Sequence, residues 1–162
     1  MDIRRITDQY NVSQQISVED VSDIKAAGIT TVICNRPDME VPPSHQADVI
    51  RAAVEAAGMK FEELPITHQT MTSDRVAVQS SIVDASDGPV LAYCASGTRC
   101  SMLWAFSQAG HLSSDDILGA VSRAGYDLSA MRPALESIAV GRRYSKSAGS
   151  TGPVENPPKF KS

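Results

Sequence analysis

The chain has few cysteines and no long apolar stretch, and both absences exclude whole classes of protein. Its 162 residues include three cysteines, which cannot all pair with one another, so a disulfide framework is excluded. No run of about 18 apolar residues is present, and the start, Met1–Arg5, lacks the apolar stretch of a signal peptide. We therefore expect a cytoplasmic protein with reduced thiols and no membrane-spanning segment.

Motifs for nucleotides and metals are missing as well. The chain contains no Gly-x-Gly-x-x-Gly and no Walker loop, and its three histidines (His45, His68 and His111) have no metal-ligand spacing. The net charge of −4 argues against a general nucleic-acid or anionic-membrane binder. We expect no metal and no cofactor, and no nucleic acid or membrane among the partners.

Composition divides the chain near residue 140. From Ser145 onward the chain has no periodicity and is rich in Gly, Pro and Ser. Residues 141–162 carry five basic residues and one acidic one, a net charge of +4 that leaves −8 for residues 1–140. Such a segment buries too little apolar surface to offset the entropy of ordering it. We predict a catalytic domain over residues 1–140 and a flexible basic tail over residues 141–162.

Residues 1–140 alternate between strand-like and helix-like segments. Short apolar or β-branched segments predict strands, and apolar residues at helical spacing predict helices, one of them capped by Ser44. This alternation predicts an α/β fold of three layers, with a mostly parallel central sheet flanked by helices. The expected strands are 30–34, 60–66 and 89–93, with 3–6 and 10–13 as an antiparallel addition at the edge. The expected helices are 18–27, 46–57, 73–85, 99–109, 115–124 and 129–139.

One loop carries a pattern typical of thiol chemistry. The strand at 89–93 runs into Cys94, then into a short loop of small residues, and then into a helix opened by Arg99. Backbone amides and a helix N-terminus at the carboxyl end of a strand stabilise a thiolate and bind anions. We predict Cys94 as nucleophile and Arg99 as anion-binding cation; a cysteine that merely packs at the strand end is the alternative. The anion-binding loop comprises Ala95, Ser96, Gly97 and Thr98.

These residues also resemble known families. Cys-x-x-Gly-x-Arg after a strand resembles the active loop of rhodanese-type sulfurtransferases, and its setting resembles the phosphate loop of cysteine phosphatases. More closely, residues 1–140 resemble the phosphatase-like domain of bacterial beta-lactamase hydrolase-like proteins. The matching stretches are Tyr10–Ile16, Asn35–Asp38, Gly88–Arg99 and Ala124–Leu128.

The resemblance carries implications for fold and partner. It implies a tyrosine-phosphatase-like α/β fold. In this family the domain is often joined to a metallo-β-lactamase-like persulfide dioxygenase, which the resemblance therefore implies as a partner.

Loop length separates the two chemistries that the resemblance allows. Only four residues stand between Cys94 and Arg99, the length typical of sulfurtransferases, whereas phosphatases have five and would need arginine where Cys100 stands. Rhodaneses usually place arginine directly after the nucleophile, where this chain has Ala95. A general acid for phosphate-ester cleavage is also missing from residues 67–71, apart from His68.

We therefore predict a sulfurtransferase. Cys94 would take sulfur from thiosulfate or a small persulfide and pass it to a thiol. A cysteine phosphatase acting through a cysteinyl phosphate is the first alternative, with a small phosphate ester as its anionic substrate. A non-catalytic redox or anion-sensing module is the second.

Six residues are candidates for auxiliary roles. Arg36 follows the strand at 30–34, where it can attract an anionic substrate, and Asp38 or Glu40 can orient that substrate or act as acid or base; a rigid loop with a solvated Arg–Asp pair is the alternative. His68 can donate a proton or be a surface residue. Cys34 and Cys100 can trap or resolve an oxidised Cys94, and simple packing is the alternative for each.

Overall fold

A five-stranded sheet forms the centre of the protein. The computed structural model describes residues 1–150, with side chains through Tyr144. The strand order is β1-β2-β5-β3-β4, and all pairs are parallel except β1 with β2. The strands are β1 (Arg4–Arg5), β2 (Tyr10–Ser13), β3 (Thr31–Cys34), β4 (Lys60–Glu63) and β5 (Val90–Tyr93).

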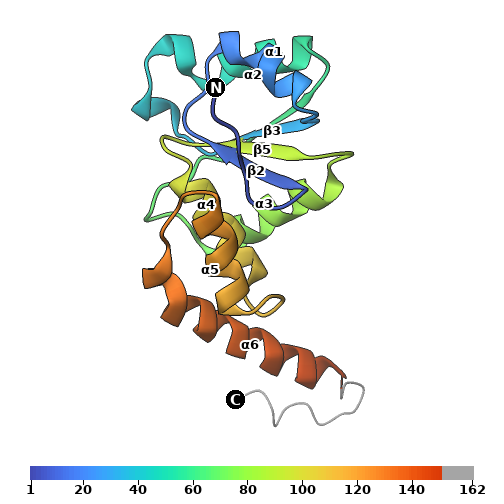
Figure 1. The fold of residues 1–162 in the computed structure, drawn as a ribbon, viewed down its shortest axis with the longest axis vertical. Coiled ribbons are helices and arrows are strands. Elements are labelled where there is room, and N and C mark those ends of the chain that lie inside the picture. Colours follow the sequence, from blue (N-terminus) through green and yellow to red (C-terminus); the bar gives the residue numbers. More distant parts are fainter. Residues whose placement is uncertain (151–162) are drawn as a thin grey trace.

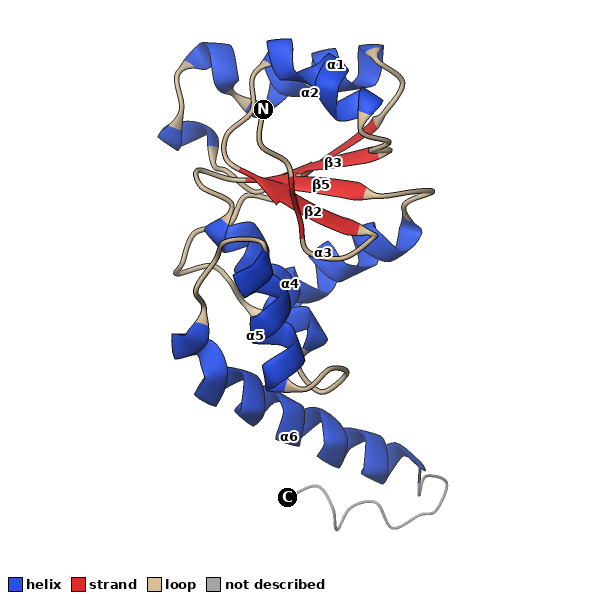
Figure 2. Ribbon diagram, in the orientation of Figure 1, coloured by secondary structure: helices blue, strands red, loops and turns tan. Residues whose placement is uncertain are grey.

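Helices cover both faces of this sheet, which confirms the predicted three-layer α/β fold. Helices α1 and α2 lie on one face, and α3, α4 and α5 lie on the other (Figures 1 and 2). Helix α6 packs against α5 and α4 and extends away from the sheet. The helices are α1 (Val21–Ala26), α2 (Ala47–Ala56), α3 (Ser73–Ala85), α4 (Thr98–Gln108), α5 (Ser114–Arg123) and α6 (Arg132–Ser150). Short 3₁₀ turns are η1 (Val18–Asp20), η2 (Asp38–Glu40), η3 (Pro43–His45) and η4 (Ser129–Met131).

Two apolar cores lie on opposite sides of the sheet. Alternate residues of β5 divide between them: Leu91 packs with α1 and α2, whereas Ala92 packs with α4, α5 and α6. All four residues of β5 are buried, as expected of a strand covered on both faces. The loop that follows β5 is therefore anchored in a rigid part of the molecule.

The residue that caps α2 differs from the sequence prediction. Ser44 was expected to cap the helix that begins near residue 46, but it lies inside η3. The cap comes instead from Asp38, whose Oδ1 accepts the N–H of Ala47 at 2.7 Å. A carboxylate is the stronger acceptor at a helix N-terminus, because it also meets the positive end of the helix dipole.

Other departures from the prediction include the end of one strand, the pairing of another and the length of the last helix. The strand expected at 60–66 ends at Glu63, and β2 is not only part of an edge hairpin, because it also pairs in parallel with β5. The helix expected to end at residue 139 continues through Ser150, so residues 141–150 are helical. In this continuation the Arg142 guanidinium donates to carbonyls at the end of α4, among them those of Phe106 and Ser107. Residues 151–162 of the predicted tail lie outside the described residues.

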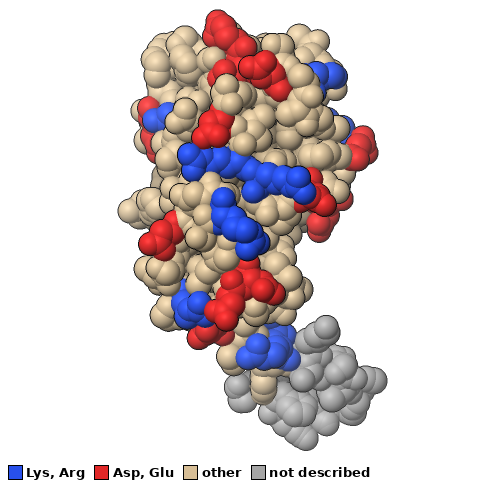
Figure 3. All heavy atoms as spheres, viewed as in Figure 1, with Lys and Arg blue, Asp and Glu red and all other residues tan. Residues whose placement is uncertain are grey.

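Charged side chains of both signs are interspersed on the face shown in Figure 3.

Within residues 1–150, no helix combines the length and apolarity needed to cross a membrane.

Candidate active site

Cys94 stands directly after β5, at the carboxyl end of the parallel strands. Backbone hydrogen bonds tie this point to the segment after β2: the Cys94 N–H donates to the carbonyl of Ser13 at 3.4 Å, and the Gln15 N–H donates to the carbonyl of Ala95 at 3.2 Å. Only 1% of Cys94 is exposed. The predicted position of the thiol, at the sheet edge where α/β proteins bind ligands, is confirmed.

The loop turns its backbone N–H groups toward the sulfur. The Gly97 N–H donates to Cys94 Sγ at 3.1 Å. The hydrogen bond from the Cys100 thiol, together with the N–H groups of Cys100, Gly97 and Ser96, lowers the pKa of Cys94 to about 5, although burial acts in the opposite direction. Cys94 is therefore a thiolate at neutral pH, the form that acts as a nucleophile.

Cys100 is the partner thiol of this thiolate. It is completely buried in the first turns of α4, and burial raises the pKa of its thiol well above the usual value. A protonated Cys100 beside an ionised Cys94 makes a charge-assisted hydrogen bond. The predicted redox role of Cys100 remains a prediction.

Gly97 allows the loop to close tightly. Its φ of +98° lies in the left-handed region, which glycine adopts without a steric cost. A Cβ at this position would lie 2.1 Å from the hydroxyl oxygen of Tyr126. Ser96 Oγ and Thr98 Oγ1, at 2.9 Å from each other, lie on the exposed side of the loop.

Arg99 is held by an ion pair and a carbonyl. Its Nη1 and Nη2 donate to the two carboxylate oxygens of Glu40 at 3.0 and 2.8 Å, and Nη1 also donates to the carbonyl of Ile66 at 2.8 Å. These contacts use three of the five guanidinium hydrogens, which leaves Nε–H and one hydrogen of Nη2 for an anion. Hydrogen bonding to Arg99 is the main cause that lowers the pKa of Glu40, so this carboxyl is ionised.

Arg36 reaches the same carboxylate from the loop after β3. Its Nε lies 3.2 Å from Glu40 Oε1, and its Nη1 donates to Gln15 Oε1 at 3.3 Å. Glu40 thus joins the two predicted cations, Arg36 and Arg99, into one cluster beside the loop.

The other predicted auxiliary residues lie elsewhere. The carboxylate of Asp38 caps α2. His68 is exposed in the segment after β4. Cys34 ends a strand that pairs with β5, as predicted, but its thiol donates to the carbonyl of Arg36 at 3.4 Å, and burial raises its pKa. The structure therefore gives Asp38 a structural contact, and the chemical roles of His68 and Cys34 stay predictions.

A buried hydrogen-bond network holds the backbone groups on both sides of Arg99. Asn35 and Gln79 exchange two amide hydrogen bonds, of 3.0 and 2.9 Å. The backbone carbonyl of Asn35 accepts the N–H of Ile66 at 2.8 Å, and the Gln79 side chain donates to the hydroxyl of Tyr10 at 3.0 Å. That hydroxyl donates to the carbonyl of Cys100 at 2.8 Å. The network thus fixes both the carbonyl that receives Arg99 and the helix turn that bears it.

Several supporting residues of the site were given no role from the sequence. Tyr10 and Asn35 stand in stretches that match the family, but no chemistry was argued for them, and Gln79 showed only an amide at a position of apolar periodicity. Tyr126 also stands in a matching stretch, but nothing in the spacing of the chain indicated its contact with the loop 30 residues upstream.

Comparisons with known proteins identify the family of the chain. A family model described as the phosphatase-like domain of beta-lactamase hydrolase-like protein matches residues 2–111. The beta-lactamase hydrolase-like protein of Agrobacterium fabrum is 32% identical over 135 residues, which cover 82% of this chain and 31% of that protein. The chain therefore spans about a third of the length of this relative.

Solved structures give the same result for the fold. A candidate phosphatase from Neisseria meningitidis is 33% identical, with a TM-score of 0.78 over 85% of this chain and 99% of that one. TpbA from P. aeruginosa, solved in complex with pTyr, is 17% identical, with a TM-score of 0.55 over 83% of this chain and 90% of that one. The second likeness shows the fold alone, which is that of cysteine phosphatases, as predicted.

Proposed function

Because the chain belongs to the phosphatase-like domain family of beta-lactamase hydrolase-like proteins, we propose that it is a cysteine-dependent phosphatase acting on a small phosphate ester. The observation that carries the proposal is the buried thiolate of Cys94, which receives the Gly97 N–H at the carboxyl edge of the sheet. The sequence prediction ranked sulfur transfer first, and the comparisons favour its phosphatase alternative.

The residues of the loop suit a two-step displacement. The sulfur of Cys94 attacks phosphorus and forms an S–P bond while the P–O bond to the leaving group breaks, and the electron pair goes to the leaving oxygen. Loop N–H groups and the free hydrogens of Arg99 stabilise the negative charge on the phosphoryl oxygens. Water then attacks phosphorus, the S–P bond breaks, and inorganic phosphate and the thiolate are released.

The charge state of Glu40 favours one class of substrate. Glu40 contacts Arg99 but is held ionised by it, so its carboxyl does not supply a proton to the leaving oxygen at neutral pH. A phenol leaves as a far more stable anion than an aliphatic alcohol does. Aryl phosphate esters are therefore the proposed substrates, and TpbA, which has the same fold, was solved with an aryl phosphate, pTyr.

The test is hydrolysis of two phosphate esters by the wild-type chain and Cys94→Ser. We expect release of p-nitrophenol from p-nitrophenyl phosphate, slower release of phosphate from glycerol phosphate, and loss of both with Cys94→Ser. Acid-quenched mass spectrometry should find a phosphoryl group on the Cys94 peptide. Activity that survives in Cys94→Ser, or a wild-type chain that hydrolyses neither ester, contradicts the proposal.

Sulfur transfer is the second candidate, and one observation favours it. The loop holds four residues between Cys94 and Arg99, one fewer than the phosphatase pattern described above, and a second thiol, Cys100, lies against the nucleophile. In this reaction the Cys94 thiolate takes the outer sulfur of thiosulfate and sulfite leaves. Intact-mass measurement after exposure to thiosulfate, and separately to a small persulfide, distinguishes the candidates: a gain of one sulfur that requires Cys94 supports transfer, and an unchanged mass with both donors contradicts it.

A further inference from the structure

One peptide unit of the loop is hydrogen-bonded at both ends. The N–H of Gly97 donates to Cys94 Sγ at 3.1 Å, and the carbonyl of the same peptide, that of Ser96, accepts from the Tyr126 hydroxyl at 2.9 Å. A trans peptide is planar, with its N–H and C=O pointing in opposite directions. Fixing the carbonyl therefore fixes the direction of the N–H.

This peptide needs a partner to stay in place. Its rotation changes ψ of Ser96 and φ of Gly97, and glycine accepts positive and negative φ almost equally. Without a bond to the carbonyl, the peptide can turn its oxygen toward the sulfur, which places a dipole of the wrong sign beside a thiolate. The bond from Tyr126 opposes this rotation and also polarises the N–H, since hydrogen bonds in a chain strengthen one another.

Tyr126 is itself held from three sides. Its ring packs against Gly97, where a Cβ would lie 2.9 Å from the ring carbon that bears the hydroxyl. Its N–H donates to the carbonyl of Val121 at 2.9 Å, and the Arg4 guanidinium lies 5.4 Å from the ring centroid. Arg4 also donates to the carbonyl of Ala124 at 3.0 Å. The tyrosine is thus a rigid donor.

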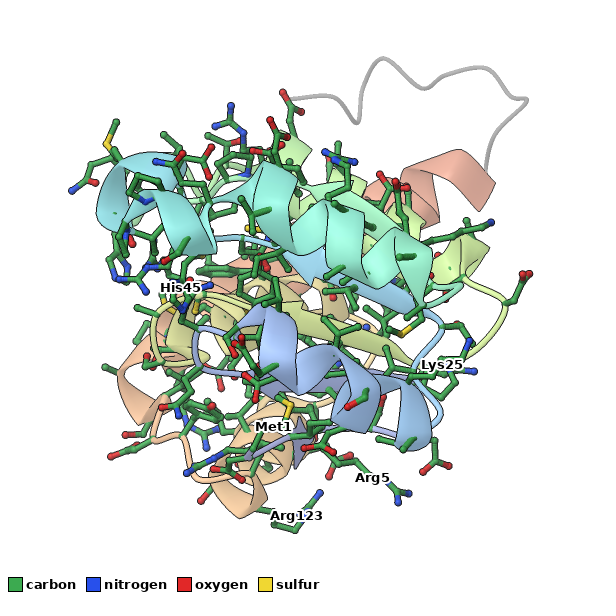
Figure 4. The ribbon with its side chains drawn as sticks, turned by 90° about the horizontal axis from the view of Figure 1, so that it is seen from above. Met1, Arg5, Lys25, His45 and Arg123 are labelled. Carbon is green, nitrogen blue, oxygen red and sulfur yellow. The ribbon has the colours of Figure 1, made fainter. Side chains whose placement is uncertain are left out.

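Strand β1 and the end of α5 are neighbours on one side of the molecule. Figure 4 shows their labelled residues, Arg5 and Arg123, on that side. The Arg4 bonds described above come from the same strand, so β1 supports the segment that carries Tyr126.

We propose that Tyr126 is a positioning residue, which holds the Ser96–Gly97 peptide so that its N–H faces the sulfur of Cys94. This inference rests on the proposed function only in that Cys94 is the reactive group. Tyr126 touches neither the sulfur nor a substrate and acts through the peptide.

The test measures the reactivity of Cys94 against pH in Tyr126→Phe. This variant keeps the ring and removes only the hydroxyl. Tyr93→Phe is the matched control, because it also removes a buried phenolic hydroxyl, which lies in the core on the other face of the sheet from Cys94 and Cys100 and makes no hydrogen bond to the loop. Alkylation of Cys94 by iodoacetamide is followed by mass spectrometry of its peptide, which separates it from the other two thiols.

We expect the midpoint of the alkylation curve to rise by about one pH unit in Tyr126→Phe, and by no more than about a few tenths in Tyr93→Phe. Tyr126→Leu, which also removes the ring, should move the midpoint at least as far. An unchanged midpoint in Tyr126→Phe, or an equal rise in Tyr93→Phe, overturns the proposal. The alkylation needs no substrate, so a wild-type chain that hydrolyses no phosphate ester would contradict the proposed function and leave this result standing.

Discussion

Arg99 and Glu40 form a two-pronged ion pair between the first turn of α4 and the 3₁₀ turn after β3, with N–O distances of 2.8 and 3.0 Å. The Arg99 side chain is 11% exposed and that of Glu40 is 30% exposed, so the pair is only partly screened by water. It joins the candidate catalytic loop to a segment 59 residues earlier in the chain.

Removing the Glu40 carboxylate should therefore cost stability. Glu40→Gln leaves a largely buried guanidinium without its counter-charge, and we expect unfolding free energy to fall by about 1–2 kcal/mol. The control is Glu63→Gln, whose pair with Arg51 is longer, 3.4 Å, and more exposed, and which should cost less than about 1 kcal/mol. Urea denaturation measures both values. Equal losses of unfolding free energy in the two variants would show that burial does not increase the stability contributed by the Arg99–Glu40 pair.

The thiol of Cys100 should control the acidity of Cys94. Its hydrogen bond is the largest cause that lowers the pKa of Cys94 to about 5. Cys100→Ala removes the donor, so the thiolate is populated only at higher pH, and alkylation of Cys94 at pH 6 should slow several-fold. Cys100→Ser keeps a donor of similar size and should slow the reaction less. If both variants are alkylated at the wild-type rate, the low pKa of Cys94 is due to the backbone N–H groups alone.

The buried amide pair should be sensitive to loss of one partner. Gln79→Met keeps the approximate volume but leaves Asn35 Oδ1 without its donor, while Asn35 Nδ2 keeps its bond to the carbonyl of Leu64, and we expect a loss of about 2 kcal/mol in unfolding free energy. Gln69→Met, at an exposed position, is the control and should change stability by less than about 0.5 kcal/mol. Thermal and urea unfolding measure the stability of the two variants. An unchanged unfolding free energy in Gln79→Met would show that the amide pair does not contribute to stability.

Gly97 should tolerate no side chain. Gly97→Ala combines an unfavourable φ of +98° with a Cβ 2.1 Å from the Tyr126 hydroxyl, so either the loop or the tyrosine must move. Gly28→Ala isolates the backbone cost, since Gly28 has a similar φ of +90° and nothing within 4 Å of its Cβ. We expect a loss of about 1 kcal/mol for Gly28→Ala and at least twice that for Gly97→Ala. Similar losses of unfolding free energy in the two variants would show that the positive φ, and not the contact with Tyr126, accounts for the destabilisation.

The layers of the fold could be predicted because their signals are local. Apolar strands such as Val90–Tyr93 and helix stops such as Gly28 depend on neighbours in sequence. The end of α6 could not be predicted in this way. Residues 141–150 have the composition of a tail, and tertiary bonds such as those of Arg142 to the end of α4 oppose that tendency.

The position of the loop was predictable for the same reason, whereas its supports were not. Cys94 through Arg99 form one contiguous pattern, but Glu40 and Tyr126 reach that pattern through contacts 59 and 30 residues away. Asp38 shows the opposite case: an acid in a loop at the sheet edge suggested chemistry, and its oxygen was needed by a helix. The choice of sulfur transfer over phosphoryl transfer depended on one residue of loop length and on the missing general acid, and the comparisons favour the phosphatase alternative.

The location of Tyr126 shows which segments pack together around the loop. The family model matches residues 2–111, but α5, Tyr126 and Leu135 share an apolar core with Cys94 and Cys100. A polypeptide cut at residue 111 would keep every predicted loop residue and yet expose that core and lose the hydroxyl bound to Ser96. The segment by which the family is identified is therefore shorter than the segment whose residues pack around the loop.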